Sequence, residues 1–267
     1  MFETQDSFWF FINIGRQLAS LGEPIVLANL VANAHINLRI AVRMVRLVSI
    51  LEISMVKIVH KNSGKILLRA KNESIRGRLL SGHNLAGADF SGQDLSGCKF
   101  IGCNLCDANF SGCNLSFARF DNCSLRRANF SDATLTKADF SDSVLDVAKF
   151  TRCIAVGVQF RHAKLNGADL SRGNFNNGDF SFSEARSEFN HATLIGANMF
   201  GADFCGADFT QADLRDADMT DSKIARATFT YTKLEGSIRA NGRPWGFSVK
   251  APHSRKAWWK VWDSAAV

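Results

Sequence analysis

The pattern of apolar and polar residues repeats every five positions from about residue 85 to residue 234. Of 30 quintet centres, 28 are Leu, Phe, Met or Ile, such as Phe90, Phe100 and Leu105, and the residue two positions before the centre is small in every quintet except the one with Gln93. An amphipathic helix would space its apolar residues by three and four, and an ordinary strand would alternate them without interruption. Neither element has a period of five. We interpret each quintet as a short extended segment with two inward side chains and a corner, which predicts a coiled solenoid.

The large centres also predict how many quintets make one coil. Phe and Leu alternate as centres up to residue 180, so that the pattern recurs every ten residues. Four sides per coil would put Phe on two opposite walls and Leu on the other two, filling the interior in layers. Thirty consecutive quintets then make seven to eight coils. The predicted core is Phe90, Phe110, Phe130 and Phe150 on one wall, Phe100, Phe120, Phe140 and Phe160 on the opposite wall, and Leu105 and Leu125 between them.

Single quintets carry a motif of their own. Residues 108–112 read Ala-Asn-Phe-Ser-Gly and residues 202–206 read Ala-Asp-Phe-Cys-Gly. These residues resemble the pentapeptide repeat family, whose consensus is Ala-(Asp/Asn)-Leu-x-x, over roughly 150 of the 267 residues. The resemblance implies an all-β solenoid, namely a right-handed quadrilateral β-helix. Asp and Asn residues before the centres are therefore interpreted first as repeat positions.

Two irregularities interrupt the repeat. The centres Ala185 and Phe189 are four residues apart, and we expect the coil to continue across this step with Phe189 on the wall of Phe90. In the segment Cys153–Val158 the centre shrinks to Ala155, and apolar residues occupy nominally outward positions. This second irregularity predicts a local bulge.

The chain divides into four parts by pattern. Residues 1–54 are predicted to form a helical amphipathic segment, residues 55–80 a β-hairpin that leads into the solenoid and caps it, and residues 81–240 the β-helix. Residues 241–267 form a basic, Trp-rich tail that is expected to be a short C-terminal cap. Met55 is an alternative start of translation, which would remove the helical segment.

Composition and charge argue against chemistry within the repeats. The 22 Phe against one Tyr suit a dry interior, and five of the seven Cys occupy the small inward position. A Cys-x-x-Cys pair occurs once, at Cys103 and Cys106, without a second pair, so no metal site or cofactor is predicted. The histidines are scattered, and no catalytic constellation stands out. The sequence therefore predicts a protein that is not an enzyme.

The flanks hold the basic excess. Residues 81–240 contain 19 acidic and 16 basic residues, whereas the whole chain has a net charge of +7. The candidate interaction residues lie in these flanks, and each flank is interpreted either as a cap or partner-facing segment or as a membrane-interface segment. They are Arg39, Arg43 and Arg46 on one helical face and Trp258, Trp259, Lys260 and Trp262 in the tail.

These features predict a rigid protein-binding or scaffolding module in a bacterial cytoplasm, with a protein partner that the sequence does not identify. One alternative is a protein peripheral to the inner membrane, tethered by its flanks. A second, implied by the family resemblance, is a DNA mimic that modulates DNA gyrase or topoisomerase, although Lys99, Arg119 and Lys149 interrupt the acidic columns that mimicry needs. Nucleic acid is not an expected partner. Self-association is expected at a solenoid end, where a homodimer could form, rather than at the walls.

Overall fold

The computed structural model describes residues 55–71 and 74–242. The expected helical segment, the seven candidate interaction residues and the tail from residue 243 onward lie outside these ranges. The chain divides into two compact units, and nearly all described residues belong to the unit made of Lys57–Arg69 and Ser74–Val267. That unit contains the β-helix.

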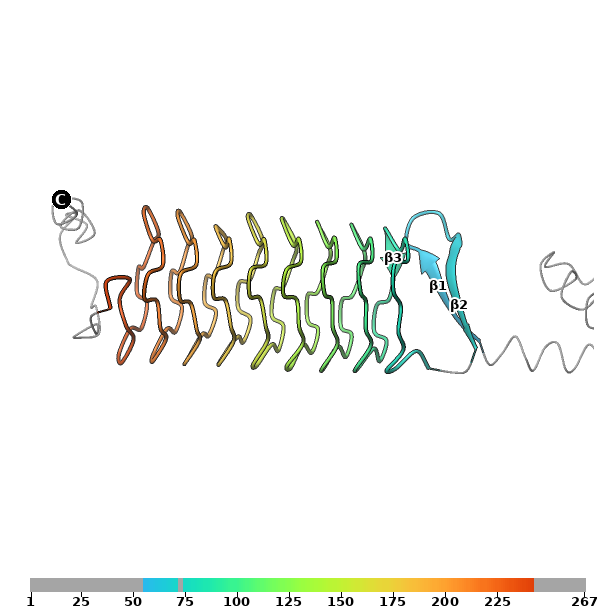
Figure 1. Cartoon of the computed structure of the whole chain (residues 1–267), viewed down its shortest axis with the longest axis horizontal. Coiled ribbons are helices and arrows are strands. Elements are labelled where there is room, and N and C mark those ends of the chain that lie inside the picture. The colour runs from blue at the N-terminus through green and yellow to red at the C-terminus, as the bar shows by residue number, and fades with distance from the viewer. Residues whose placement is uncertain (1–54, 72–73, 243–267) are drawn as a thin grey trace, which may run out of the picture. The chain divides into compact units, whose positions relative to one another are not determined.

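Three strands form a small sheet where the β-helix begins. They are β1 (Met55–His60), β2 (Ile66–Lys71) and β3 (Ala88–Asp89), in the order β2-β1-β3. β1 and β2 flank a turn closed by the bond from the Gly64 amide to the His60 carbonyl, 2.9 Å long. β1 runs antiparallel to β3, with Val59 opposite Asp89, so it pairs the edge of the first coil on that side (Figure 1). A paired edge no longer offers its hydrogen bonds to another chain.

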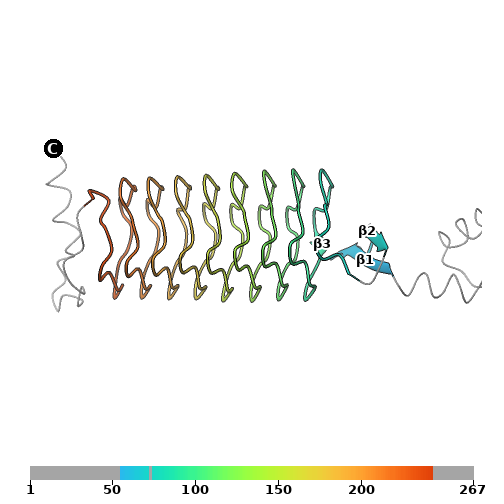
Figure 2. The same ribbon diagram turned by 60° about the horizontal axis from the view of Figure 1, so that its bottom comes forward.

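The rest of the described chain forms stacked coils (Figures 1 and 2). Parallel bridges join residues 20 positions apart, as in Asp89 to Asn109 and Asn109 to Asn129. Since the sequence repeat is five residues, one coil contains four quintets and has four walls. We name the walls by an early centre: wall A has Phe90, wall B Leu95, wall C Phe100 and wall D Leu105.

Each corner is a two-residue turn whose second residue has a left-handed backbone. Gly112 has φ of 64° and Asp107 has φ of 59°, and the same conformation recurs in nearly every quintet. This conformation favours Gly, Asn and Asp, and it costs other residues roughly 1–2 kcal/mol. The corner amides are bonded to the next coil, as in Asp107 N to the Arg126 carbonyl at 2.9 Å. Stacking therefore satisfies groups that an isolated turn would leave to water.

The interior contains two columns of Phe rings. Phe130 on wall A stacks on Phe110 with ring centroids 4.9 Å apart and meets Phe120 of wall C edge-on at 5.9 Å and 84°. Offset stacking and edge-to-face contact are the favoured ring geometries, and here both repeat from coil to coil. All ten core residues named from the sequence are fully buried.

The four-residue step leaves the coil intact. The bridge spacing changes from 20 between Lys164 and Glu184 to 19 between Asp169 and Glu188, and returns to 20 between Glu188 and Asp208. Phe189 consequently lies on wall A, as expected. Ser187 takes the small inward position, and its hydroxyl donates to the Leu165 carbonyl.

The bulge expected at Cys153–Val158 is wrong. Ile154 pairs in register with Thr134 below and Asn174 above, as its neighbours do. The small centre Ala155 is fully buried, so the narrowing leaves no break in the wall.

The next coil on wall B explains why the wall stays regular. There the centre is Phe175, and the small inward residue is Gly173 instead of the usual Ala. A Cβ added at Gly173 would lie 2.4 Å from Cε2 of Phe175 and 3.3 Å from Sγ of Cys153. The Phe175 ring therefore lies against Gly173, and on this wall one small centre, Ala155, is followed by one large centre, Phe175.

Gly173→Ala should destabilise the protein by about 1 to 3 kcal/mol, although Ala is the usual residue at this position, because its methyl group would overlap the Phe175 ring. Chemical denaturation of this variant, of Phe175→Leu and of the double variant forms a mutant cycle. Phe175→Leu removes the overlap, so the double variant should lose less stability than the two single losses combined. Additive losses would contradict the proposed overlap.

Candidate interaction surface

The outward Asp and Asn residues before each centre are used by the fold. Oδ1 of Asp89 accepts a hydrogen bond of 3.1 Å from the Ser91 amide. It accepts a second, of 3.0 Å, from Nδ2 of Asn109 on the next coil. Oδ1 of Asn109 accepts the Ser111 amide at 3.2 Å in the same way. These side chains close the following turn and connect neighbouring coils. The structure thus shows a structural use for these repeat positions.

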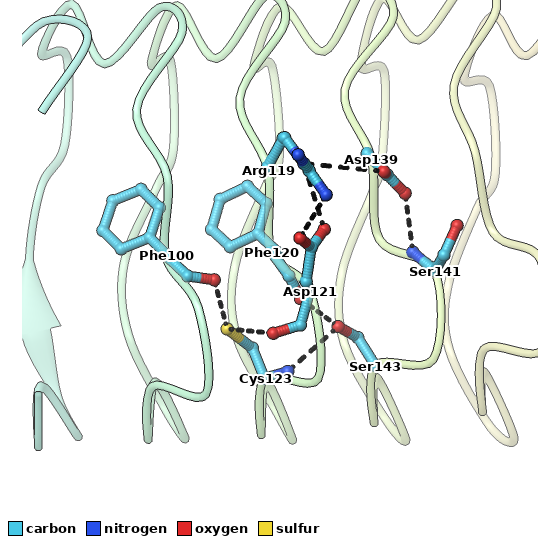
Figure 3. A network of polar contacts seen from close by, with 8 residues as sticks. All are labelled: Phe100, Arg119, Phe120, Asp121, Cys123, Asp139, Ser141 and Ser143. Carbon is cyan, nitrogen blue, oxygen red and sulfur yellow. Dashed lines mark hydrogen bonds and ion pairs between the residues drawn. The ribbon is translucent and has the colours of Figure 1, made fainter. Parts of the chain in front are cut away.

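The buried thiols are bonded to backbone carbonyls. The Cys123 thiol donates to the Phe100 carbonyl at 2.8 Å, and the Ser143 hydroxyl one coil later makes the equivalent bond to Phe120 (Figure 3). Cys113 donates to the Phe90 carbonyl at 2.9 Å. A thiol and a hydroxyl are thus interchangeable at this inward position. The Cys residues buried there are Cys98, Cys103, Cys113, Cys123 and Cys153.

Burial makes most of these thiols poor nucleophiles, whereas the hydrogen bond with Cys123 lowers the pKa of Cys103. Burial raises the pKa of the Cys113 thiol to about 11 and also raises the pKa values of Cys98 and Cys153. The hydrogen bond with Cys103, followed by burial, raises the pKa of Cys123. Among the described residues, no group of three or more His, Cys, Asp or Glu side chains is arranged to hold a metal ion.

Thiol labelling of the native protein should reach at most two sites in the β-helix, Cys106 and Cys205, which are half-buried. Burial and the Asp203 carboxylate raise the pKa of Cys205, so Asp203→Asn should speed its labelling and leave Cys106 as an internal control. Mass spectrometry of timed maleimide reactions measures both rates. Rapid labelling of Cys113 or Cys153 would contradict the inward assignment.

Several basic residues of the β-helix are paired with acids, most often on a neighbouring coil. Arg127 makes two bonds of 2.8 and 2.6 Å to Asp107, and Arg152 makes two of 2.8 and 2.7 Å to Asp132. Arg119 pairs with Asp121 on its own coil and approaches Asp139 of the next coil to 3.9 Å (Figure 3). Exposed pairs add little stability, but they cancel charge along the walls.

The acidic residues of the later coils are distributed around the β-helix. Asp203, Asp208, Asp213 and Asp218 lie on four different walls. Asp213 accepts two bonds of 2.8 and 2.7 Å from Arg215. The carboxylates therefore form a ring around the coil, partly neutralised, and not a continuous acidic face.

Asp203 provides a test of pH dependence. The Asp203 carboxylate is hydrogen-bonded to the Arg186 side chain and to the Cys205 amide. These bonds lower its pKa to about 2, below the roughly 3.9 of an unfolded Asp. The ionised form therefore stabilises the fold above about pH 4, and this contribution is lost as the pH falls through about 2. The difference in Tm between the parent and Asp203→Asn should be constant above pH 4 and shrink below it. The exposed corner carboxylate of Asp142, changed to Asn, is the control, and an unchanged Asp203→Asn difference down to pH 2 would contradict the pairing.

Large apolar side chains are exposed at several corners. Phe117, Val147, Phe182 and Tyr231 all have left-handed backbones and lie on four different corners. The Phe182 ring stacks on His162 at 5.3 Å. Sequence reasoning missed these residues, although a bulky residue at the second turn position is a readable signal, since Gly, Asn or Asp is favoured there. Ile154 and Val156 are the outward apolar residues of the segment Cys153–Val158, and Ile154 is about half exposed.

The stacked coils and the bridge register define the molecule as a parallel β-helix solenoid. Residues 80–150 match the family model "Pentapeptide repeat region", and residues 145–181, 187–224 and 206–238 match the model "Pentapeptide repeats (8 copies)". Together these matches cover more than half of the chain. The chain belongs to the pentapeptide repeat family.

Several solved structures are similar, whereas no curated protein matches. HetL, a pentapeptide repeat protein involved in heterocyst differentiation regulation in the cyanobacterium Nostoc, is 22% identical over 64% of this chain and 91% of its own, with a TM-score of 0.33. QnrB1, a plasmid-mediated fluoroquinolone resistance protein, is 22% identical over 62% and 89%, with a TM-score of 0.32. A pentapeptide repeat protein of the Arabidopsis thaliana thylakoid lumen is 38% identical over 33% and 66%, with a TM-score of 0.27. The family assignment rests on the repeat models and the coil register.

Proposed function

We propose that the β-helix is a non-enzymatic protein-binding or scaffolding module that works in a bacterial cytoplasm. The observation that carries the proposal is the use of the reactive groups by the fold itself. Outward Asx side chains close turns, buried thiols bond to carbonyls, and Arg residues pair with Asp on neighbouring coils. The rigid walls of the β-helix are the surface available to a partner, and a rigid surface loses little conformational entropy on binding.

The finer architecture that we propose is right-handed, with seven to eight coils and a C-terminal cap formed by residues 241–267. Bridges from the pair Leu79 and Lys99 to the pair Asp218 and Ile238 support the coil number. A solenoid needs its open end covered, and the tail continues directly from the last bridged coil.

Capture from native cells followed by binding measurements with the purified partner tests the binding role. The full chain and a chain without residues 241–267 should bind the same protein, because the walls are present in both. A tail-less chain that binds nothing would move the binding role from the β-helix to the tail.

Membrane attachment is the second candidate function, and charge favours it. Residues 55–71 contain five Lys or Arg and no acidic residue, which adds to the basic flanks. Within the described residues, no helix has the length and apolarity to cross a membrane. Flotation with anionic vesicles, with and without residues 1–54, separates the candidates: loss of flotation on removal of that segment would favour the membrane role.

Modulation of gyrase or topoisomerase by DNA mimicry has less support. Mimicry needs extended acidic columns, whereas wall C presents Lys99, Arg119 and Asp139 in succession. A gyrase supercoiling assay should therefore show no inhibition by the purified protein. Strong inhibition would contradict the argument from the walls.

A further inference from the structure

One wall has a long uncharged strip. On wall B, the residue before each centre and the residue after it face outward, and both are uncharged over five successive coils. The other walls carry charge in the same region, at Lys149 on wall A, Arg119 on wall C and Lys164 on wall D. We call these residues the neutral strip. They are Asn114, Ser116, Thr134, Thr136, Ile154, Val156, Asn174, Asn176, Thr193 and Ile195.

The centre of the neutral strip is apolar. Ile154 is 51% exposed on the middle coil, with half-buried Val156 beside it and Thr134 and Asn174 on the coils on either side. Phe117, 61% exposed, projects from the adjoining corner. Along the wall, this apolar centre is flanked by uncharged polar side chains, as in the core and rim of a protein interface, while Lys137 and Arg152 lie on the bordering corners.

Charge is unevenly distributed along the β-helix. Residues 55–71 and 74–165 contain 16 Lys or Arg and 8 Asp or Glu, whereas residues 166–242 contain 7 and 11. The early coils are therefore basic and the later coils acidic. Two copies side by side would attract if they ran antiparallel and repel if they ran parallel.

We propose that the neutral strip binds the same strip of a second copy, in an antiparallel dimer whose two-fold axis passes through Ile154. This self-association is separate from the proposed binding of another protein. It also departs from the expectation that only the ends associate, because one wall lacks the charges that the other walls carry.

The register of the coils specifies which residues meet. A two-fold axis at Ile154 pairs each coil with the coil equally far on the other side, so Thr134 faces the partner's Asn174. On one bordering corner Asp132 faces the partner's Arg172, and on the other Phe117 faces the partner's Gly196. The axis thus sets Asp132 against an arginine and a large ring against a glycine. It also sets Arg152 against the partner's Arg152, and each of these arginines is paired with Asp132 of its own copy at 2.7 Å.

The size of the strip predicts a weak dimer. Five coils spaced by about 4.8 Å give a contact roughly 24 Å long, which is short for a permanent interface. The dimer should therefore dissociate on dilution, with a Kd on the order of micromolar to tens of micromolar.

Analytical ultracentrifugation of the full chain over a concentration series tests the surface. The parent should dimerise, and Ile154→Lys should raise the Kd by about tenfold or more, because it puts two ammonium groups on the axis. Val147→Lys is the matched control, since Val147 is equally exposed, at 54%, on a different corner. A parent that stays monomeric at roughly 100 μM, or a Kd raised equally by both variants, would overturn the proposal.

Cross-linking tests the antiparallel arrangement. In a chain with Cys106→Ser and Cys205→Ser, Ile154→Cys should cross-link to itself with a short bismaleimide. Asn114→Cys alone should not, but a mixture of Asn114→Cys and Thr193→Cys should yield the mixed dimer. Self-linking by Asn114→Cys would show a parallel pair and overturn the model.

Discussion

Phe130→Ala is expected to cost on the order of 3 to 5 kcal/mol of unfolding free energy, the largest loss that we predict for a single substitution. The Phe130 ring stacks on Phe110 at 4.9 Å and on Phe150 at 4.8 Å. It also meets Phe120 and Phe140 edge-on at 5.9 and 5.3 Å. Removing it leaves a cavity bounded by four rings, and the hydrogen-bonded coils cannot collapse to fill it.

Chemical denaturation followed by circular dichroism measures this loss. Phe229→Ala is the matched control, because Phe229 lies near the end of the same column, is 7% exposed and stacks on Phe209 at 5.2 Å. Its loss should be clearly smaller. A loss below about 1 kcal/mol for Phe130→Ala would contradict the ring columns on which the four-walled interior depends.

The coil register could be predicted from the sequence because it depends on a short, repeated pattern. Nearly every quintet supplies an inward pair, and the alternation of Phe and Leu predicts the number of walls before any contact is known. The four-residue step at Ala185 could be followed in the same way, since the centres after it continue the columns. Local pattern is sufficient where each coil contacts only its neighbours.

The bulge was predicted wrongly because the compensation comes from another coil. Ala155 is small, but the centre of the next coil on the same wall is Phe175, whose ring lies against Gly173. These residues are 20 and 18 positions from Ala155, so a reading of one quintet cannot see them. Packing volume is shared between stacked coils, and a pattern of single residues does not record it.

The candidate surface was harder to predict than the fold. From the sequence, association is expected in the flanks and at the solenoid ends rather than at the walls. The uncharged run on wall B appears only when residues 20 apart are aligned, and its importance depends on the exposure of Ile154. Repeat pattern indicates which positions face outward, but not which of them remain available after turn closure and ion pairing.

Deletions of different length provide the second large effect. Removing residues 131–135 should destabilise the protein more than removing residues 131–140, although it removes fewer residues. The alternation of Phe and Leu has a period of ten, so a ten-residue deletion again places Phe over Phe and Leu over Leu, except that Ala155 lies over Leu125. A five-residue deletion instead turns all later coils by one wall, which sets Phe140 over Leu115 and Ala155 over Phe130.

The five-residue deletion therefore concentrates the mismatch in one layer. That layer receives three Phe centres and one Leu, so it is overpacked, while the layer with Ala155 over Phe130 leaves a void. Overpacking costs about 1–3 kcal/mol, and a void left by a small residue in place of a large one costs a similar or larger amount. The five-residue deletion should therefore lower the free energy of unfolding by on the order of 3 to 6 kcal/mol. The ten-residue deletion should lose little beyond the stability of the quintets removed, because its joined layer holds Phe130, Leu145, Phe150 and Ala155, and no layer gains a third Phe.

Thermal unfolding of both variants, with removal of the whole coil 131–150 as a third, gives the decisive order. The 20-residue deletion retains every wall, so its loss measures what one coil contributes, and the ten-residue deletion should lie close to it in Tm. The five-residue deletion should be the least stable of the three. If stability instead decreased steadily with the number of residues removed, the interior would not distinguish Phe walls from Leu walls. The layered packing, rather than the hydrogen-bonded coils alone, would then be the part of this account to abandon.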